Sequence, residues 1–145
     1  MAEVFDLSHE EQEALQEMLK SEKLCYNDIS DDGVKLYGIS IKHVHVGYFG
    51  FEQFGENALF RSMLVQPDAR KRGYGTLIWN EAKKTLKEQG VSNVYLLTNT
   101  AADFFEKLGF AIIERNSVPE SIANTTEFRD FCPDSSTCMK ININE

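Results

Sequence analysis

The sequence has few cysteines, no long apolar run and no surplus of basic residues, and each shortage excludes a class of protein. Three cysteines fit a reducing compartment better than a disulfide framework. No apolar run approaches the roughly 20 residues that a membrane-spanning helix needs. Lys and Arg number 15 against 23 for Asp and Glu, a net charge of −8 that argues against nucleic-acid binding. The acidic N-terminus shows no apolar leader core, so we expect a cytoplasmic protein without a membrane partner.

Length and composition predict one globular domain over residues 1–145. Hydrophobic residues make up 42% of the chain and charged residues 26%, a normal balance for a protein with a sizeable core. The charge is uneven, because residues 1–33 hold ten acidic and two basic side chains, whereas residues 67–90 hold six basic and three acidic ones. A basic region within an acidic chain suggests a small anionic ligand rather than a polyanion.

Hydrophobic periodicity predicts an ordered series of helices and strands. Ser8 and Glu11 have the spacing of a capping box ahead of an apolar stripe, which predicts the first helix over 8–20. The other predicted helices lie at 75–89 and 101–108. The predicted strands lie at 34–42, 43–54, 58–65, 93–98, 110–115 and 137–143, with a hairpin turn at 55–57. This order predicts an α+β domain with a mixed, mostly antiparallel sheet and flanking helices.

The segment after the third predicted strand combines glycines with basic residues. Gly73 and Gly75 let a ligand approach the backbone closely, and the next helix presents its positive N-terminal end. No Gly-Lys-Ser/Thr follows, and the third glycine of a dinucleotide-binding fingerprint is missing. A solvated turn stays open as an alternative, but the position between strand and helix favours a pyrophosphate site. Its residues would be Arg70, Lys71, Arg72, Gly73, Tyr74 and Gly75.

Two motifs resemble those of a known superfamily. The R-x-x-G-x-G pattern at 70–75 is similar to the acetyl-CoA-binding signature of the Gcn5-related N-acetyltransferases (GNAT). Residues 101–110, AADFFEKLGF, resemble the A-x-x-x-(F/Y)-E-K-L-G-F segment of the same superfamily. The predicted order of elements matches that fold over nearly the whole chain. The resemblance implies a GNAT-like single domain that uses acetyl-CoA as co-substrate to acetylate a primary amine.

Shorter pieces of the sequence resemble one branch of that superfamily, the acetyltransferases encoded near arsenic-resistance genes. The run Leu-Leu-Thr-x-Thr-Ala at 96–101 is also similar to the acetyltransferase domain of glutamate N-acetyltransferases. This resemblance implies a small amine or amino acid as acceptor, and it leaves a homodimer open. The pieces are Phe60-Arg61-Ser62, residues 96–101, Val118-Pro119, Glu127-Phe128, Cys132-Pro133 and Cys138-Met139.

The resemblance also assigns residues to the coenzyme. In the superfamily, the backbone at the positions of Met63, Leu64 and Val65 pairs with the pantetheine arm, and the 70–75 segment holds the pyrophosphate. Thr98 stands where many relatives carry an asparagine that bonds the pantetheine.

Phe105 departs from the pattern, because many relatives carry a tyrosine there that protonates or stabilises the leaving thiolate. Phenylalanine has no acidic proton. Water, another hydroxyl such as that of Thr100, or no acid at all would then handle the thiolate.

The acceptor side needs a group that removes a proton from an ammonium. Glu52, near the end of a predicted strand, is the candidate base, and Glu56 in the turn is the fallback. Arg61 is a candidate anchor for an acceptor carboxyl group, because Arg forms bidentate contacts with carboxylates. The alternatives are an exposed strand carboxylate for Glu52, and an outward-facing residue or a structural partner of Glu52 for Arg61.

No metal site is expected. His43 and His45 alternate along a predicted strand without a third ligand nearby, so we expect exposed strand residues. Cys132 and Cys138 do not have a zinc-binding spacing, and packed cysteines are favoured.

The favoured function is an N-acetyltransferase in which the amine attacks acetyl-CoA directly in a ternary complex. A non-catalytic acyl-CoA-binding sensor is the first alternative, supported by Phe105. Acetylation of a protein N-terminus or lysine is the second, since the acidic N-terminal region could attract a basic peptide.

Overall fold

Seven strands form one sheet in the part of the chain that the computed structural model describes, residues 2–21, 33–69, 73–98, 101–125, 128 and 136–144. The strands are β1 (Ala2–Asp6), β2 (Val34–Ile41), β3 (Val44–Phe54), β4 (Asn57–Val65), β5 (Asn93–Thr98), β6 (Ala111–Ile113) and β7 (Thr137–Asn142). The helices are α1 (His9–Ser21), α2 (Tyr74–Glu88), α3 (Ala102–Lys107) and α4 (Glu120–Ala123), with single 3-10 turns at Pro67–Ala69 and Arg115–Ser117.

The strand order is β1-β2-β3-β4-β5-β7-β6, and β4–β5 is the one parallel pair in it. Helix α2 makes the crossover between these two strands, as a parallel pair requires. A two-residue turn joins β3 to β4, with Gly55 at φ 64° in its first position. The structure therefore confirms the expectation of a mixed, mostly antiparallel sheet with flanking helices.

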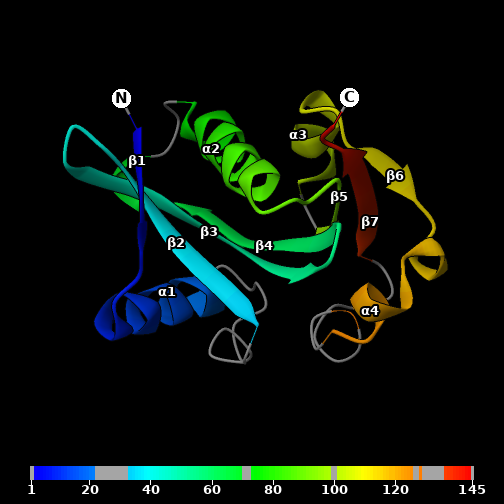
Figure 1. The fold of residues 1–145 in the computed structure, drawn as a ribbon. Helices are drawn as coiled ribbons and strands as arrows, with labels where there is room; N and C mark the ends of the chain where they lie inside the picture. The colour runs from blue at the N-terminus through cyan, green and yellow to red at the C-terminus, as the bar shows by residue number, and fades with distance from the viewer. Residues whose placement is uncertain are drawn as a thin grey trace.

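Helices cover both faces of the sheet (Figure 1), and each face has its own hydrophobic cluster. On the face covered by α2, here the α2 face, Ile78, Trp79 and Ala82 pack with Phe49 and Phe60 of the sheet. On the opposite face, here the α1 face, Leu15, Leu19 and other residues of α1 pack with Leu36, Tyr48 and Leu64. Helix α4 covers a separate cluster on the α1 face, composed of Leu59, Tyr95, Ile122, Phe128 and Cys138.

Strand β1 was not expected from the sequence, which showed no strand before the first helix. Its five residues pair antiparallel with β2 from Ala2↔Ile41 to Asp6↔Tyr37. The partner lies more than 30 residues away in the chain, so the strand forms through long-range pairing and leaves little local pattern. In the described residues, no helix is long and apolar enough to span a membrane.

The capping box at the start of α1 is present as expected. The Glu11 N–H donates to Ser8 Oγ at 3.2 Å, and the Ser8 N–H donates to Glu11 Oε1 at 2.9 Å. The hydrogen bond from the Ser8 backbone lowers the pKa of Glu11 below its ordinary value of 4.5, against a smaller opposing effect of burial.

We expect Ser8→Ala to lower the free energy of unfolding by about 1 kcal/mol, because it removes the N-cap acceptor. Urea denaturation of both proteins at pH 7 measures this difference. Ionised Glu11 contributes to the stability of the fold. This contribution is complete above the ordinary pKa of a glutamate and is lost as the pH falls through the lowered pKa of Glu11 in the folded protein. A denaturation midpoint that does not change at pH 7 would contradict the expectation.

Candidate active site

Strands β4 and β5 diverge from a short paired end. They pair over three positions, Asn57↔Asn93 to Leu59↔Tyr95, after which β5 continues along β7 (Figure 1). A ladder of amide side chains closes the paired end. Asn93 Nδ2 donates to Asn57 Oδ1, and Asn142 Nδ2 donates to Asn93 Oδ1, each at 3.2 Å. Beyond Leu59 the sheet therefore opens between β4 and β5, on the side where β4 runs toward α2.

A β-bulge lies on β4 beside this opening. Tyr48 pairs with Leu64 and Gly50 with Arg61, so Ser62 and Met63 together face the single residue Phe49. Ser62 adopts φ 58°, a left-handed conformation that is uncommon for serine. The extra residue also shifts the alternation of side chains, which places Arg61 and Leu64 both on the α1 face. A bulge leaves part of the strand's backbone out of the ladder, and here that part borders the opening.

The start of α2 has the features of an anion site. Gly73 precedes the helix at φ 77°, and it provides no side-chain cap for the N–H groups of the first turn. No acidic residue lies in that turn, and a Cβ atom built on Gly73 would meet nothing within 4 Å. First-turn N–H groups that Gly73 does not cap, at the positive end of a 15-residue helix, suit a phosphate group. The predicted ligands Arg70, Lys71 and Arg72 lie outside the described residues.

Thr98 and Phe105 flank the other side of the opening. Thr98 Oγ1 accepts a hydrogen bond from the Ala101 N–H at 3.0 Å, so this hydroxyl helps to start α3. The Phe105 ring is 8% exposed and packs edge-to-face on Phe110, with ring centroids 5.4 Å apart. Phe105 is thus also a core residue. Thr100, the alternative hydroxyl, lies outside the described residues.

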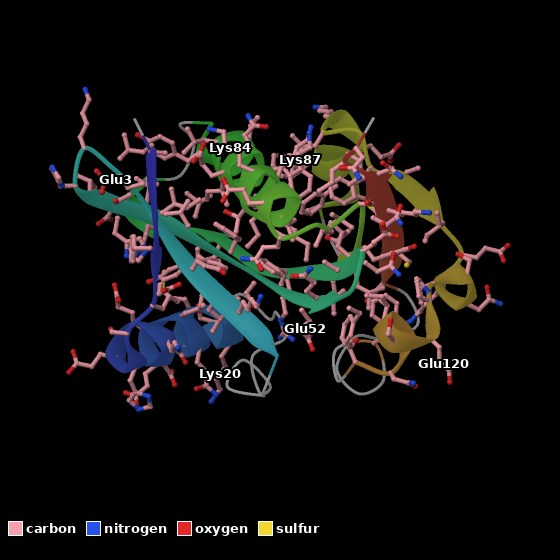
Figure 2. All side chains as sticks on the ribbon, viewed as in Figure 1. Glu3, Lys20, Glu52, Lys84, Lys87 and Glu120 are labelled. Atoms are coloured by element: carbon pink, nitrogen blue, oxygen red, sulfur yellow. The ribbon has the colours of Figure 1, made fainter. Side chains whose placement is uncertain are left out.

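Glu52 and Arg61 form an ion pair on the α1 face. Arg61 Nη1 lies 3.1 Å from Glu52 Oε2, and the exposed fractions of the two side chains are 1% and 12% for Arg61 and Glu52. Glu52 is therefore not an exposed strand carboxylate and Arg61 does not face outward, so these two alternatives are wrong. The third alternative, that Arg61 is a structural partner of Glu52, agrees with the ion pair. Figure 2 shows Glu52 between α1 and α4 on that face. Glu56, the fallback base, is an exposed turn residue.

His43 and His45 do not both lie on a strand, as the sequence had suggested. His43 lies in the β2–β3 turn at φ 68°, not on a strand. His45 is half-buried on β3, where its ring packs on Phe5 and Tyr48 and Nε2 lies 2.9 Å from the Gly47 carbonyl oxygen. The two side chains therefore do not share a strand face.

The described residues contain no group of three or more His, Cys, Asp or Glu side chains that could hold a metal. Cys138 is buried as expected, and burial raises the pKa of its thiol, although nearby Arg115 opposes this effect. Cys132 lies outside the described residues.

Two features of the site were missed by sequence reasoning. The bulge at Ser62 has no local signal, since no glycine marks its positive φ. Phe104 reaches the first turn of α2, which its neighbours in the sequence do not indicate.

Comparisons with known proteins agree with this geometry. A family model described as an acetyltransferase (GNAT) domain matches residues 32–112. An uncharacterized N-acetyltransferase of Chlorobaculum tepidum is 34% identical over 86 residues, which cover 58% of this chain and 52% of that protein. The chain thus matches about half the length of this curated relative.

Solved structures show the same fold. N-acetylglutamate synthase from Neisseria gonorrhoeae, complexed with coenzyme A and N-acetyl-glutamate, gives a TM-score of 0.78 at 16% identity, covering 100% of this chain and 36% of that one. A GNAT-family acetyltransferase from Staphylococcus aureus gives 0.76 at 20% identity, covering 99% of both chains. The arsenic-resistance or amino-acid branch stays a prediction. The family match alone covers more than half of the sequence, and the chain belongs to the GNAT acetyltransferase family.

Proposed function

We propose that the protein is an acetyl-CoA-dependent N-acetyltransferase whose acceptor is a primary amine of a small, amino-acid-like molecule. The observation that carries the proposal is the opening between β4 and β5, with a bulge on one side and the uncapped start of α2 at its end. The bulge and the helix start would bind the two ends of one extended ligand, a thioester at the first and a pyrophosphate at the second.

The coenzyme would lie along β4. Backbone groups of Met63, Leu64 and Val65 would pair with the pantetheine arm, and the residues from 70 to 75 would bind the pyrophosphate. Thr98 and Phe105 border the same opening from β5 and α3. Several solved neighbours support this reading, because the N. gonorrhoeae enzyme and an N-acetyltransferase from Thermoplasma acidophilum are complexed with coenzyme A.

The reaction would be a direct transfer. The neutral amine nitrogen attacks the thioester carbonyl carbon and forms the carbon–nitrogen bond, the carbon–sulfur bond breaks, and the sulfur leaves as a thiolate. The second proton that the nitrogen loses as it becomes an amide passes to the thiolate through water. Backbone N–H groups near the bulge at Ser62 would polarise the carbonyl oxygen as charge develops on it. The proton of the acceptor ammonium must go to a base, and the partly exposed carboxylate of Glu52 is the candidate.

Arg61 fits a positioning role better than the carboxyl anchor expected from the sequence. Its side chain is 1% exposed and its Nη1 already contacts Glu52, so little of the guanidinium surface is left for an acceptor. The amino-acid character of the acceptor is supported instead by the N-acetyl-glutamate in the N. gonorrhoeae structure.

The test is a screen for release of the coenzyme A thiol with amino acids, simple amines and basic peptides as acceptors. Turnover with free amino acids supports the proposal. Turnover with peptides alone would instead favour protein acetylation. Tight acetyl-CoA binding without any turnover would favour the sensor, whose one structural support is the missing hydroxyl at Phe105.

We expect Phe105→Tyr to raise the single-turnover rate or leave it level. The change adds one hydroxyl to a ring of the same shape at a position bordering the opening, where it could donate to the leaving thiolate. Rapid-quench measurement of one turnover isolates this step from product release. The matched control is Phe110→Tyr, which adds the same group deeper in the aromatic cluster and should not raise the rate. A lower rate in a folded Phe105→Tyr protein would contradict the expectation.

A further inference from the structure

Three elements meet at Gly75, in the first turn of α2. A Cβ atom built on Gly75 would lie 3.0 Å from Cζ and 3.3 Å from Cε1 of the Phe104 ring. It would also lie 3.5 Å from Cε of Met63. The tip of the Phe104 ring, on α3, therefore rests against the backbone of α2 and beside the Met63 side chain of β4. A Cβ at this position would require the Phe104 ring to shift by a few tenths of an ångström.

The ring spans the opening between β4 and β5. Helix α2 follows β4 in the chain and α3 follows β5, and both helices lie on the same side of the sheet (Figure 1). A side chain that reaches from α3 to α2 therefore crosses from one border of the opening to the other. Gly75, Met63 and Phe104 are all half-buried, so the contact lies at the margin of the core, where solvent reaches it.

Under the proposed function, on which this inference rests, the ring stands in the path of the coenzyme. The thioester end would lie at the bulge of Ser62 and the pyrophosphate end at the first turn of α2. The arm that joins the two ends must pass Gly75, against which the ring rests, and Met63, whose Cε lies beside the same position.

We propose that Phe104 controls the entry of the coenzyme, because its ring closes the opening in the free protein and turns aside when the coenzyme binds. Its surroundings permit this motion. The rings of Phe104 and Phe105 pack edge-to-face with their centroids 5.2 Å apart. The Phe105 ring in turn packs edge-to-face on Phe110, with centroids 5.4 Å apart. The buried Phe105 holds the helix in place, while the half-buried Phe104 is partly exposed to solvent. Gly75 then has two roles, since it admits the ring in the free protein and the pyrophosphate in the complex.

The alternative is that Phe104 is a fixed wall of the site. The association and dissociation rate constants of coenzyme A distinguish a moving ring from a fixed one. If the ring closes the opening, the association rate constant is reduced by the fraction of time that it is open. If the ring is only a wall, its removal loses contacts in the complex and accelerates dissociation.

The first test is stopped-flow measurement of coenzyme A binding to the wild type and to Phe104→Ala. We expect the association rate constant to rise at least threefold in the variant. The matched control is Phe5→Ala, which removes another half-buried ring at the far edge of the sheet, on β1, and should leave this constant unchanged. An unchanged association rate constant with faster dissociation in Phe104→Ala would overturn the proposal.

The second test needs no coenzyme turnover. The chain has four methionines, and the ε-methyl of Met63 lies beside the same Gly75 position as the tip of the Phe104 ring, so we expect the ring to shift the Met63 resonance in a methyl NMR spectrum. We expect Phe104→Leu to move this resonance in the free protein, and coenzyme A to move the wild-type resonance in the same direction. A Met63 resonance that Phe104→Leu leaves in place would overturn the closed position of the ring. Absence of any coenzyme A binding to the wild type in calorimetry would overturn the proposed function and this inference together.

Discussion

Replacing Arg61 with alanine should lower the free energy of unfolding by about 3 kcal/mol. Removing one member of a buried ion pair leaves the other charge without compensation, which typically costs about 3–5 kcal/mol. The lower end applies here, because the Glu52 side chain is 12% exposed and water can reach part of its charge. Denaturant unfolding at pH 7 measures the change.

A double variant provides the matched control for this prediction. Arg61→Met combined with Glu52→Leu replaces both charges by apolar side chains of similar size, and such exchanges are often neutral or stabilising. Its stability should lie within about 1 kcal/mol of the wild type. A loss below about 1 kcal/mol in Arg61→Ala would show that the pair contributes little to the fold.

Glu52→Gln separates the role of the pair in folding from its role in the reaction. Gln keeps the shape of the side chain and can still accept a hydrogen bond from Arg61. Turnover should fall most at low pH, where fewer acceptor amines are already neutral, while the affinity for acetyl-CoA stays unchanged. Full activity over about pH 6–9 would mean that the base lies elsewhere.

The second large effect is expected at Gly73. Gly73→Asp should weaken the binding of coenzyme A at least tenfold, equal to about 1.4 kcal/mol in calorimetry. The substitution adds a negative charge at the positive end of α2, where the pyrophosphate would bind, and a Cβ at φ 77°. Because nothing lies within 4 Å of that Cβ position, the variant should fold.

Two controls divide the effect at Gly73 into its causes. Gly73→Ala brings the same backbone strain without the charge. Gly90→Asp brings the same charge at φ 86° beyond the other end of α2, also with open space around the Cβ. It should leave coenzyme affinity within about twofold of the wild type, a difference of about 0.4 kcal/mol. Equal affinity in a folded Gly73→Asp protein would refute the anion site.

The parts of the fold that could be predicted are those specified by neighbours in the chain. The capping box of Ser8 and Glu11, the turn at Gly55 and the glycine before α2 each act within a few residues, and each is present in the structure. Strand β1 was missed because its partner β2 is far away in the sequence.

The site was less predictable for the same reason. The pairing of Glu52 with Arg61 was one of several open alternatives, because it depends on the register of β3 against β4 and on how deeply both strands are buried. His45 was placed on a strand face with His43, whereas the tight turn takes His43 off the strand. Contacts between separate elements, such as Phe104 with Gly75, leave no trace in a local pattern.

The short pairing of β4 with β5 has a mechanical consequence. Backbone hydrogen bonds connect β1–β4 with β5–β7 over three residue pairs, reinforced by the asparagine ladder at one end. At the same end the Glu56 carbonyl oxygen accepts a backbone hydrogen bond from the Ser92 N–H at 2.8 Å, and side chains such as Trp79 and Phe110, whose ring centroids lie 5.0 Å apart, pack across the α2 face. Side-chain packing yields more readily than a hydrogen-bonded ladder. We therefore expect relative motion of the two halves of the sheet to be concentrated at this short pairing, where β4 and β5 can separate further beyond Leu59 without the loss of a strand.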